Sequence, residues 1–130
     1  MIVRARAPLR LGLAGGGTDV SPYCDTYGGF VLNATIDRYA YAVIRTLDTP
    51  VVRFIASDQQ QSVDLALTER YPVDSQLSLH KAVYNEIVAS YNGGRPLAIE
   101  LTTFCDSPVG SGLGSSSTVV VVMIRAFCEL

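Results

Sequence analysis

The sequence has 130 residues, of which 48% are hydrophobic and 17% charged, and its formal net charge is −2. This length fits one domain with a packed core, and the weak charge argues against nucleic acid as a partner. The single histidine argues against a histidine metal site or a Ser–His–Asp triad, and the three widely spaced cysteines match no zinc motif or disulfide framework. The sequence has no signal peptide and no apolar run of about 18 residues, so we expect a cytoplasmic protein that does not bind a membrane.

Extended segments are predicted for much of the first half of the chain. Residues 2–14 are rich in alternating or apolar positions and predict a strand that Pro8 interrupts, and Gly15-Gly16-Gly17 ends this pattern. Residues 20–28 predict a turn or a short helix. Enrichment in β-branched and aromatic residues, or alternation of apolar positions, predicts four more strands, at residues 30–36, 39–47, 51–56 and 62–67.

One helix is predicted clearly, at residues 77–91, where apolar residues recur at three- and four-residue spacing. Its candidate N-cap residues carry short polar side chains: Asp74, Ser75 and Ser78. The run Asn92-Gly93-Gly94 is expected to end it. We expect His80 to lie at the surface or to be partly buried on this helix, rather than to act as a catalytic base.

The C-terminal third combines a strand with an apolar segment of ambiguous type. Residues 97–104 alternate and predict a strand. Residues 119–124 fit a strand, because most are β-branched, and equally a buried helix, because they are apolar on all sides. The pattern as a whole predicts an α+β fold built on one sheet.

A loop rich in glycine and serine separates these two segments. Its glycines, Gly110, Gly112 and Gly114, let the backbone approach a ligand closely and turn several N–H groups the same way. If a helix begins directly after the loop, its positive end favours an anion such as phosphate, and serine hydroxyls can add hydrogen bonds or ligate Mg²⁺. The Walker A pattern is excluded because the only lysine, Lys81, lies far from the loop. The alternative is a flexible turn with a serine N-cap.

The N-terminal segment places two charged residues on either side of a glycine turn. Arg10 lies in an otherwise apolar strand, and Asp19 follows Gly15-Gly16-Gly17 and a threonine. An aspartate can accept hydrogen bonds from the hydroxyls of a polyol, and an arginine favours phosphate. The alternative is an arginine on an edge strand and an aspartate that caps a turn.

Asp106 lies just before the loop rich in glycine and serine. For this residue, a turn-forming role is favoured over a metal contact.

Two motifs in this sequence resemble those of the GHMP kinases, a family that includes galactokinase, homoserine kinase and mevalonate kinase. The run from Pro108 to Ser117 resembles the second signature motif, with Ser117 where many members have alanine. Ala7-Pro8-Leu9-Arg10 followed by Gly15-Gly16-Gly17-Thr18-Asp19 resembles the first motif. The resemblance spans nearly the whole chain. It implies a fold like domain 2 of ribosomal protein S5, with packed helices on a mixed sheet and a left-handed crossover.

The resemblance also implies the roles of individual residues in phosphoryl transfer from ATP to a sugar. Arg10 would stabilise the charge of the transferred phosphoryl group, and Ser116 would ligate Mg²⁺. The ATP phosphates would lie against a loop of nine named residues: Pro108, Gly110, Ser111, Gly112, Leu113, Gly114, Ser115, Ser116 and Ser117. The sugar would contact residues of the N-terminal segment: Arg10, Gly16, Gly17, Thr18, Asp19 and Tyr23.

The departures from the family pattern point to a particular sugar. Gly16 and Gly17 replace the Glu and His of galactokinase, which opens room beside the sugar. The run through Tyr23 is similar to that of the heptose kinases in this family, which act on the C1 hydroxyl of D-glycero-D-manno-heptose 7-phosphate. A fucose- or galactose-type kinase and a non-catalytic sugar and ATP sensor remain alternatives.

The family also implies parts that these 130 residues do not contain. Its members are longer, with a C-terminal domain and a catalytic aspartate beyond the second motif. We therefore expect residues 1–130 to be the N-terminal, ATP- and sugar-binding domain of a longer kinase, inactive alone. A second chain or a homodimer could cover the apolar C-terminal segment. Glu129, the only carboxylate after Ser117, is not expected to bind the metal.

Overall fold

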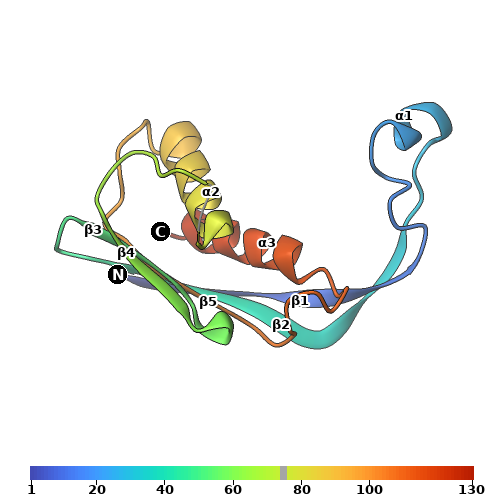
Figure 1. The fold of residues 1–130 in the computed structure, drawn as a ribbon, viewed down its shortest axis with the longest axis horizontal. Coiled ribbons are helices and arrows are strands. Elements are labelled where there is room, and N and C mark those ends of the chain that lie inside the picture. Colours follow the sequence, from blue (N-terminus) through green and yellow to red (C-terminus); the bar gives the residue numbers. More distant parts are fainter. Residues whose placement is uncertain (74–75) are drawn as a thin grey trace.

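The computed structural model describes residues 1–73 and 76–130, which form one five-stranded sheet with helices on one face (Figure 1). The strands lie in the order β1 (Ile2–Ala14), β2 (Leu32–Thr46), β5 (Ile99–Cys105), β3 (Val51–Ala56) and β4 (Gln61–Ala66). All neighbours are antiparallel except β3 and β5, which are parallel. The sheet is therefore mixed, and the predicted α+β fold is confirmed.

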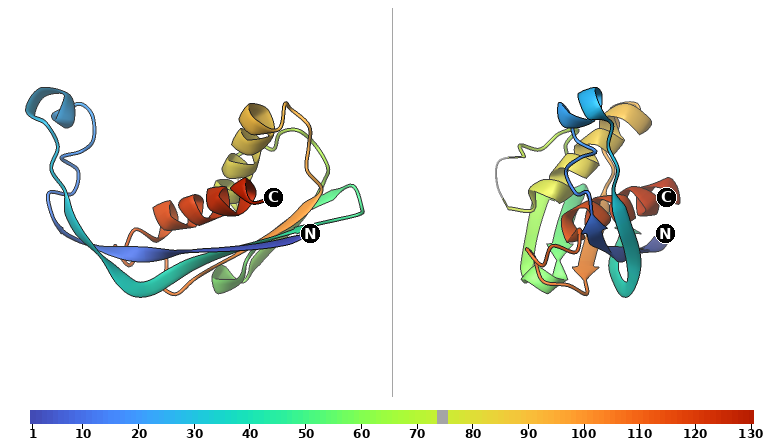
Figure 2. Two further views of the ribbon diagram at one scale, coloured as in Figure 1. Left: turned by 180° about the vertical axis from the view of Figure 1, so that it is seen from behind. Right: turned by 90° about the vertical axis from the view of Figure 1, so that its right-hand side faces the viewer.

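Two helices cover the same face of this sheet, as both views in Figure 2 show. Helix α2 (Ser78–Glu86) continues into a π-helical turn, η2 (Ile87–Tyr91), and α3 (Ser115–Cys128) follows β5. The short helix α1 (Tyr23–Tyr27) lies between β1 and β2, and the 3-10 turn η1 (Ser57–Gln59) joins β3 to β4. No helix in the described parts of the chain is long and apolar enough to cross a membrane.

The core lies between the helices and the sheet, because successive residues of a strand point to opposite faces. Alternate residues of the three central strands are buried: Ala40, Ala42, Ile44, Val52, Phe54, Ala56, Ile99, Leu101 and Cys105. The helices bury against them Val83, Tyr84, Val88, Val122, Met123, Ala126 and Phe127. Burial of each large apolar side chain contributes about 1.5–3 kcal/mol, so this layer fixes α3 and the loop before it.

The sequence predicted two breaks within strands that the structure does not show, one between residues 36 and 39 and one at Pro8. The predicted strands at residues 30–36 and 39–47 are one strand, β2, because its pairing with β1 shifts register instead of ending. Pro8 pairs with Tyr39, whereas Arg10 pairs with Thr35, so three residues of β2 bulge opposite Leu9. Pro8 does not break β1 either, because β1 is an edge strand and needs no second row of hydrogen bonds.

The helix predictions are confirmed in extent but not in their N-cap. Helical structure covers residues 78–91 without a gap, and residues 119–124 are helical within α3. Leu77 takes the N-cap position of α2 with a φ of 57°, so Ser78 is the first helical residue and not the cap. The other two proposed caps, Asp74 and Ser75, lie outside the described residues.

Residues 15–31 form an extension that we call the arm. It rises from the end of the β1–β2 ribbon on the same side of the sheet as the helices (Figures 1 and 2). Its aromatic side chains are exposed, with Tyr27 at 76% and Phe30 at 89%. The arm therefore contributes little to the core and is shaped by contacts within itself.

Candidate active site

The glycine–serine loop links the end of β5 to the start of α3. Gly110, Gly112 and Gly114 have φ angles of 83°, 74° and 71°, in the left-handed region that glycine adopts without strain. The hydroxyl groups of Ser107 and Ser111 lie 2.6 Å apart in a hydrogen bond, and the Ser111 amide donates to the Pro108 carbonyl at 3.2 Å. The alternating glycines thus turn the chain repeatedly before the helix begins.

Helix α3 begins directly after the loop, with Gly114 as its N-cap residue. The first α-helical hydrogen bond there runs from the Thr118 amide to the Gly114 carbonyl at 3.0 Å. The amides of residues 115–117 precede it, and no described side chain caps this end of the helix. Unpaired first-turn N–H groups and the positive end of the helix dipole together favour an anion, and phosphate in particular.

Arg10 lies beside this helix terminus, although it is far from it in sequence. Its backbone N–H donates to the Leu113 carbonyl at 3.3 Å. Its side chain lies against Gly114, where a Cβ atom would come 3.3 Å from Nε of Arg10. The guanidinium is exposed and forms no ion pair within residues 1–73 and 76–130. The fold therefore adds a free cation to a helix end that already favours an anion.

A cavity of about 280 Å³ adjoins the start of α3. Four segments line it: the β3–β4 turn, the first turn of α2, the end of β5, and the loop with the first residues of α3. Ser115 and Ser116 are among the lining residues. The volume is close to the lower end of the range for small-molecule pockets, about 300–1,000 Å³. Part of a phosphorylated ligand could occupy it while its phosphates contact the loop.

His80 is one of the residues that line this cavity and is 4% exposed. Its Nε2 is 2.8 Å from Oγ1 of Thr103, and its Nδ1 is buried without a hydrogen-bond partner among the described residues. Burial lowers the pKa of His80 to about 4, so the ring is neutral near pH 7. The prediction that His80 is at the surface or partly buried is therefore wrong, because the apolar face of α2 extends to this position.

Asp106 has a structural role, although its contacts are to a neighbouring strand and not the turn-forming ones that the sequence favoured. Its Oδ2 accepts a hydrogen bond from the Tyr39 amide at 2.9 Å, and its own amide donates to the Tyr39 carbonyl at 2.9 Å. It therefore extends the pairing of β2 with β5 by one residue and fixes the direction in which the chain enters the loop.

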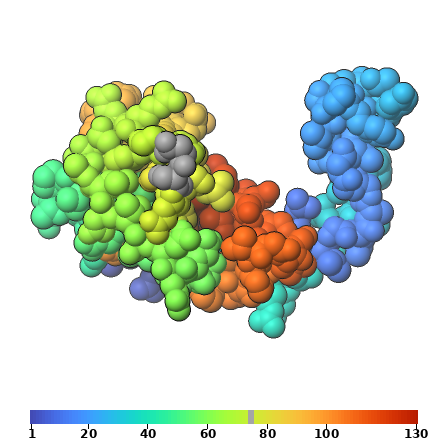
Figure 3. Space-filling view, viewed as in Figure 1, coloured from blue at the N-terminus to red at the C-terminus, as the bar shows by residue number. Residues whose placement is uncertain are grey.

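Except for Arg10, the predicted sugar-binding residues lie on the arm, apart from the loop. The space-filling view shows the arm standing away from α3 (Figure 3). Asp19 is exposed, Tyr23 is 49% exposed, and a Cβ atom added to Gly16 or Gly17 would meet nothing within 4 Å. The Thr18 hydroxyl, by contrast, is engaged in hydrogen bonds within the arm. The structure thus brings Arg10 to the loop but leaves the arm residues separate.

Sequence reasoning missed the residues that close the far side of the cavity. Asp58, Gln59 and Gln61, from the β3–β4 turn, line it together with Leu77 and Val109. The turn itself was predicted, but only the pairing of β3 with β5 brings it next to the loop. No motif in the sequence carries that information.

The implied Mg²⁺ has a suitable oxygen donor here in the Ser116 hydroxyl, and Ser115 and Asp58 line the same cavity. Mg²⁺ is usually bound by one or two carboxylates together with phosphate oxygens and water, so a serine hydroxyl fits as one ligand among several. No group of three or more His, Cys, Asp or Glu residues gathers within the part of the chain that the structure describes. Glu129 pairs with Arg125 at 2.6 Å, about 20 Å from Ser116 by the rise of an α-helix.

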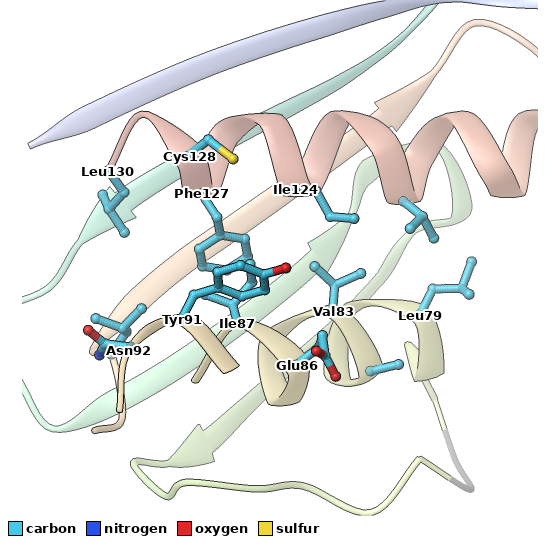
Figure 4. Close-up of a pocket in the computed structure, with 13 residues that line it drawn as sticks. Leu79, Val83, Glu86, Ile87, Tyr91, Asn92, Ile124, Phe127, Cys128 and Leu130 are labelled. Carbon is cyan, nitrogen blue, oxygen red and sulfur yellow. The ribbon is translucent and has the colours of Figure 1, made fainter. Parts of the chain in front are cut away.

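A larger cavity, of about 670 Å³, lies away from the loop, in a groove between α2–η2 and α3 (Figure 4). Its lining is mainly apolar and includes Leu79, Val83, Ile87, Ile124 and Phe127. Of the apolar residues 119–124, Val121 and Ile124 are exposed at 57% and 42%, whereas Val122 and Met123 are fully buried. The predicted second chain or homodimer that would cover this groove stays a prediction.

Comparison with known proteins defines the class to which this fold and loop belong. The family described as "GHMP kinases N terminal domain" matches residues 78–130, which include α2, β5, the loop and α3. The mevalonate kinase of Methanococcus jannaschii superimposes with a TM-score of 0.77 at 17% identity, over 99% of this chain and 39% of that one. The chain therefore resembles the GHMP kinases: residues 78–130 match the N-terminal domain of that family, and the chain as a whole has its fold.

Among these kinases, the chain is most informatively compared with heptose kinases. It is 43% identical to the D-glycero-alpha-D-manno-heptose 7-phosphate kinase of Campylobacter jejuni, over 98% of this chain and 37% of that protein. It is 46% identical to a D-glycero-D-manno-heptose 1-phosphate kinase from Bacteroides thetaiotaomicron, with a TM-score of 0.91, over 99% of this chain and 42% of that one. The L-fucokinase/L-fucose-1-P guanylyltransferase of Bacteroides fragilis is 29% identical over 99% of this chain and 16% of its own length.

The chain thus spans about two fifths of these heptose kinases. The two names also place a phosphate at different positions of the heptose.

Proposed function

We propose that residues 1–130 are the N-terminal domain of an ATP-dependent sugar kinase that phosphorylates the C1 hydroxyl of D-glycero-D-manno-heptose 7-phosphate. The observation that carries this proposal is the position of Arg10, beside the uncapped N-terminus of α3 and the glycine loop. Sequence identities of 43% and 46% to two heptose kinases support the choice of sugar.

The loop would bind ATP, with its β- and γ-phosphates against the backbone amides at the start of α3. The adjoining cavity, lined by the β3–β4 turn and the first turn of α2, has room for another part of the nucleotide. The Ser116 hydroxyl would ligate Mg²⁺, which when bound neutralises phosphate charge. Arg10 would offset the charge that develops as the phosphoryl group is transferred.

The sugar would lie between the loop and the arm, where Asp19 can accept hydrogen bonds from its hydroxyl groups. Tyr23 would provide an apolar ring surface, and the open space beside Gly16 and Gly17 would admit a large sugar. Between residues 15 and 31 the sequence has two aspartates and no Lys or Arg. The phosphate of a sugar phosphate would therefore be bound by groups outside the arm.

The carboxylate that orients the sugar hydroxyl would come from a part of the protein beyond these 130 residues. Phosphoryl transfer depends mainly on positioning and charge neutralisation, so the domain would bind both substrates but would not complete the site alone. We place the protein in the cytoplasm, where ATP and sugar phosphates are available.

The test is a substrate panel with the full-length protein. ADP release would be measured with ATP, Mg²⁺ and heptose 7-phosphate, fucose or galactose, and ³¹P NMR would locate the new phosphate. The proposal expects the highest kcat/KM with the heptose and a product phosphorylated at C1. Fucose as the preferred substrate would favour the fucokinase-like alternative, which has its own support in the 29% identity. ATP binding without turnover of any sugar would favour a non-catalytic sensor.

A further inference from the structure

The hydroxyl of Thr18 joins the two sides of the arm. It donates to the Gly15 carbonyl at 2.7 Å, with the Phe30 carbonyl also in range at 3.0 Å. It accepts a hydrogen bond from the Phe30 amide at 3.0 Å. A hydroxyl group has one hydrogen to donate, so the donor of Thr18 is fully used inside the arm. One acceptor lone pair is also occupied.

The backbone makes a second connection at the same place. A Cβ atom on Gly29 would lie 2.6 Å from the Thr18 carbonyl oxygen and 2.7 Å from Cα of Asp19. These distances are too short for any side chain, and the atoms in the way are backbone atoms that cannot rotate aside. Residues 18–19 therefore lie flush against residue 29, and glycine is required there.

Between these two contacts, the backbone of Asp19 is held while its carboxylate remains exposed. No described residue forms a hydrogen bond or ion pair with that carboxylate. A carboxylate on a fixed backbone can meet a ligand without the loss of freedom that a mobile arm would suffer. The contacts of Thr18 and Gly29 thus fix the backbone that carries the Asp19 carboxylate, the charged group of this turn that can still bind a ligand.

We propose that Thr18 and Gly29 are positioning residues that hold Asp19 for the sugar, and that Thr18 is not itself a sugar ligand. This inference rests on the function proposed above, and it reassigns Thr18 from the set of predicted sugar contacts. Both residues act through the backbone of Asp19, Thr18 by its hydroxyl and Gly29 by the absence of a side chain.

Steady-state kinetics of the full-length protein, combined in a double-mutant cycle, test this proposal. Thr18→Val keeps the side-chain shape but removes the hydroxyl, and Gly29→Ala pushes residues 18–19 away. Each is expected to lower kcat/KM for the sugar by about 10- to 100-fold with little change in the KM for ATP. Thr18→Ser keeps the hydroxyl and should restore activity. Gly12→Ala, in β1 with open space around its Cβ position, is the control and should behave as wild type.

The cycle with Asp19→Asn separates positioning from direct contact. If Thr18 acts through Asp19, Thr18→Val will have less than about a twofold effect once Asp19 is replaced. An equal loss in both backgrounds would show that Thr18 contacts the sugar itself and would overturn the proposal.

Amide hydrogen exchange of Phe30 provides a readout that needs no activity. Exchange should accelerate in Thr18→Val and stay slow in Thr18→Ser, because only the valine removes the acceptor of the Phe30 amide. Unchanged exchange in Thr18→Val would refute the hydrogen bond from the Phe30 amide to the Thr18 hydroxyl and the positioning role built on it. If the wild-type protein turns over no sugar but the two Thr18 variants still differ in exchange as expected, the result would instead refute the proposed function.

Discussion

The loop at the start of α3 and the arm both carry a family motif, but the structure holds them in different ways. The loop is anchored by α3, whose Val122 and Met123 are fully buried against the sheet. The arm has no such support and depends on the Thr18 hydroxyl and on close backbone contacts at glycines. The phosphate side of the site is therefore built into the core of this domain, whereas the sugar side is built on an extension whose large side chains face outward.

Replacement of Arg10, which lies beside the anchored loop, is expected to have the largest effect. Arg10→Ala in the full-length protein should lower kcat by about 100- to 1,000-fold, the usual loss when one group that stabilises transition-state charge is removed. Stability should change by less than about 0.5 kcal/mol, because the side chain is exposed. Steady-state kinetics and thermal unfolding measure both quantities. A fall in kcat of less than threefold would show that Arg10 is not part of the reacting centre.

Acidification should lower the stability of the domain through His80, which lines the cavity beside the loop. Its pKa is lowered to about 4 in the folded state, against about 6.5 in an unfolded chain. The unfolded state therefore binds more protons between these values, and this group lowers the free energy of unfolding as the pH falls from 6.5 to 4. The loss reaches about 3 kcal/mol at pH 4, and the group has no effect above about pH 7.

The matched variant is His80→Gln, whose amide can still bond to Thr103 but does not titrate in this range. Urea unfolding at pH 7, 5.5 and 4.5 should show the wild type losing stability relative to the variant as the pH falls. A constant difference between the two proteins across these pH values would contradict the buried, neutral histidine. The arm, which has no histidine, should not contribute to this difference.

Gly114→Ala should have a smaller effect that is specific to the loop. The residue has a φ of 71°, and a Cβ atom would press on Nε and Cγ of Arg10 at 3.3 and 3.4 Å. The left-handed conformation costs a non-glycine residue about 1 kcal/mol, so we expect a loss of stability of that size and about a tenfold rise in the KM for ATP. Gly12→Ala is again the control, because its φ is not positive. An unchanged KM for ATP would show that nucleotide does not contact this turn.

The sequence alone was sufficient for most of the fold because local patterns and packing agree there. Alternation in β3, β4 and β5 and the three- and four-residue spacing in α2 match the buried faces that the structure shows. The errors arose where long-range pairing decides the outcome. β2 continues through Asp37 because a bulge absorbs the extra residues, and Pro8 is tolerated because β1 has only one neighbour. Residues 119–124 are helical because α3 is packed on the sheet, which β-branched propensity does not reveal.

The candidate site was predictable in its residue types but not in its arrangement. Glycines in left-handed conformations follow from the pattern around Gly110–Gly114, but the helix after the loop does not, because residues 119–124 fit a strand equally well. The contact of Arg10 with Gly114 joins segments about 100 residues apart, which no local pattern contains. Likewise, the sequence does not show that Thr18 is bonded to Phe30, because that bond requires the arm to fold back on itself.

The smallest effect is expected on the arm, and it gives the most direct test of the contrast between the two regions. The Phe30 side chain is 89% exposed, so Phe30→Ser should change the free energy of unfolding by less than about 0.5 kcal/mol. The control is Phe54→Ala, at a fully buried ring in β3, which should cost about 3–5 kcal/mol. A loss above about 1 kcal/mol in Phe30→Ser, measured by urea unfolding of the full-length protein, would mean that another part of the protein packs on the arm. In that case a part of the protein outside this domain would hold the sugar side of the site in place, and the hydrogen bonds of Thr18 would be only one of its supports.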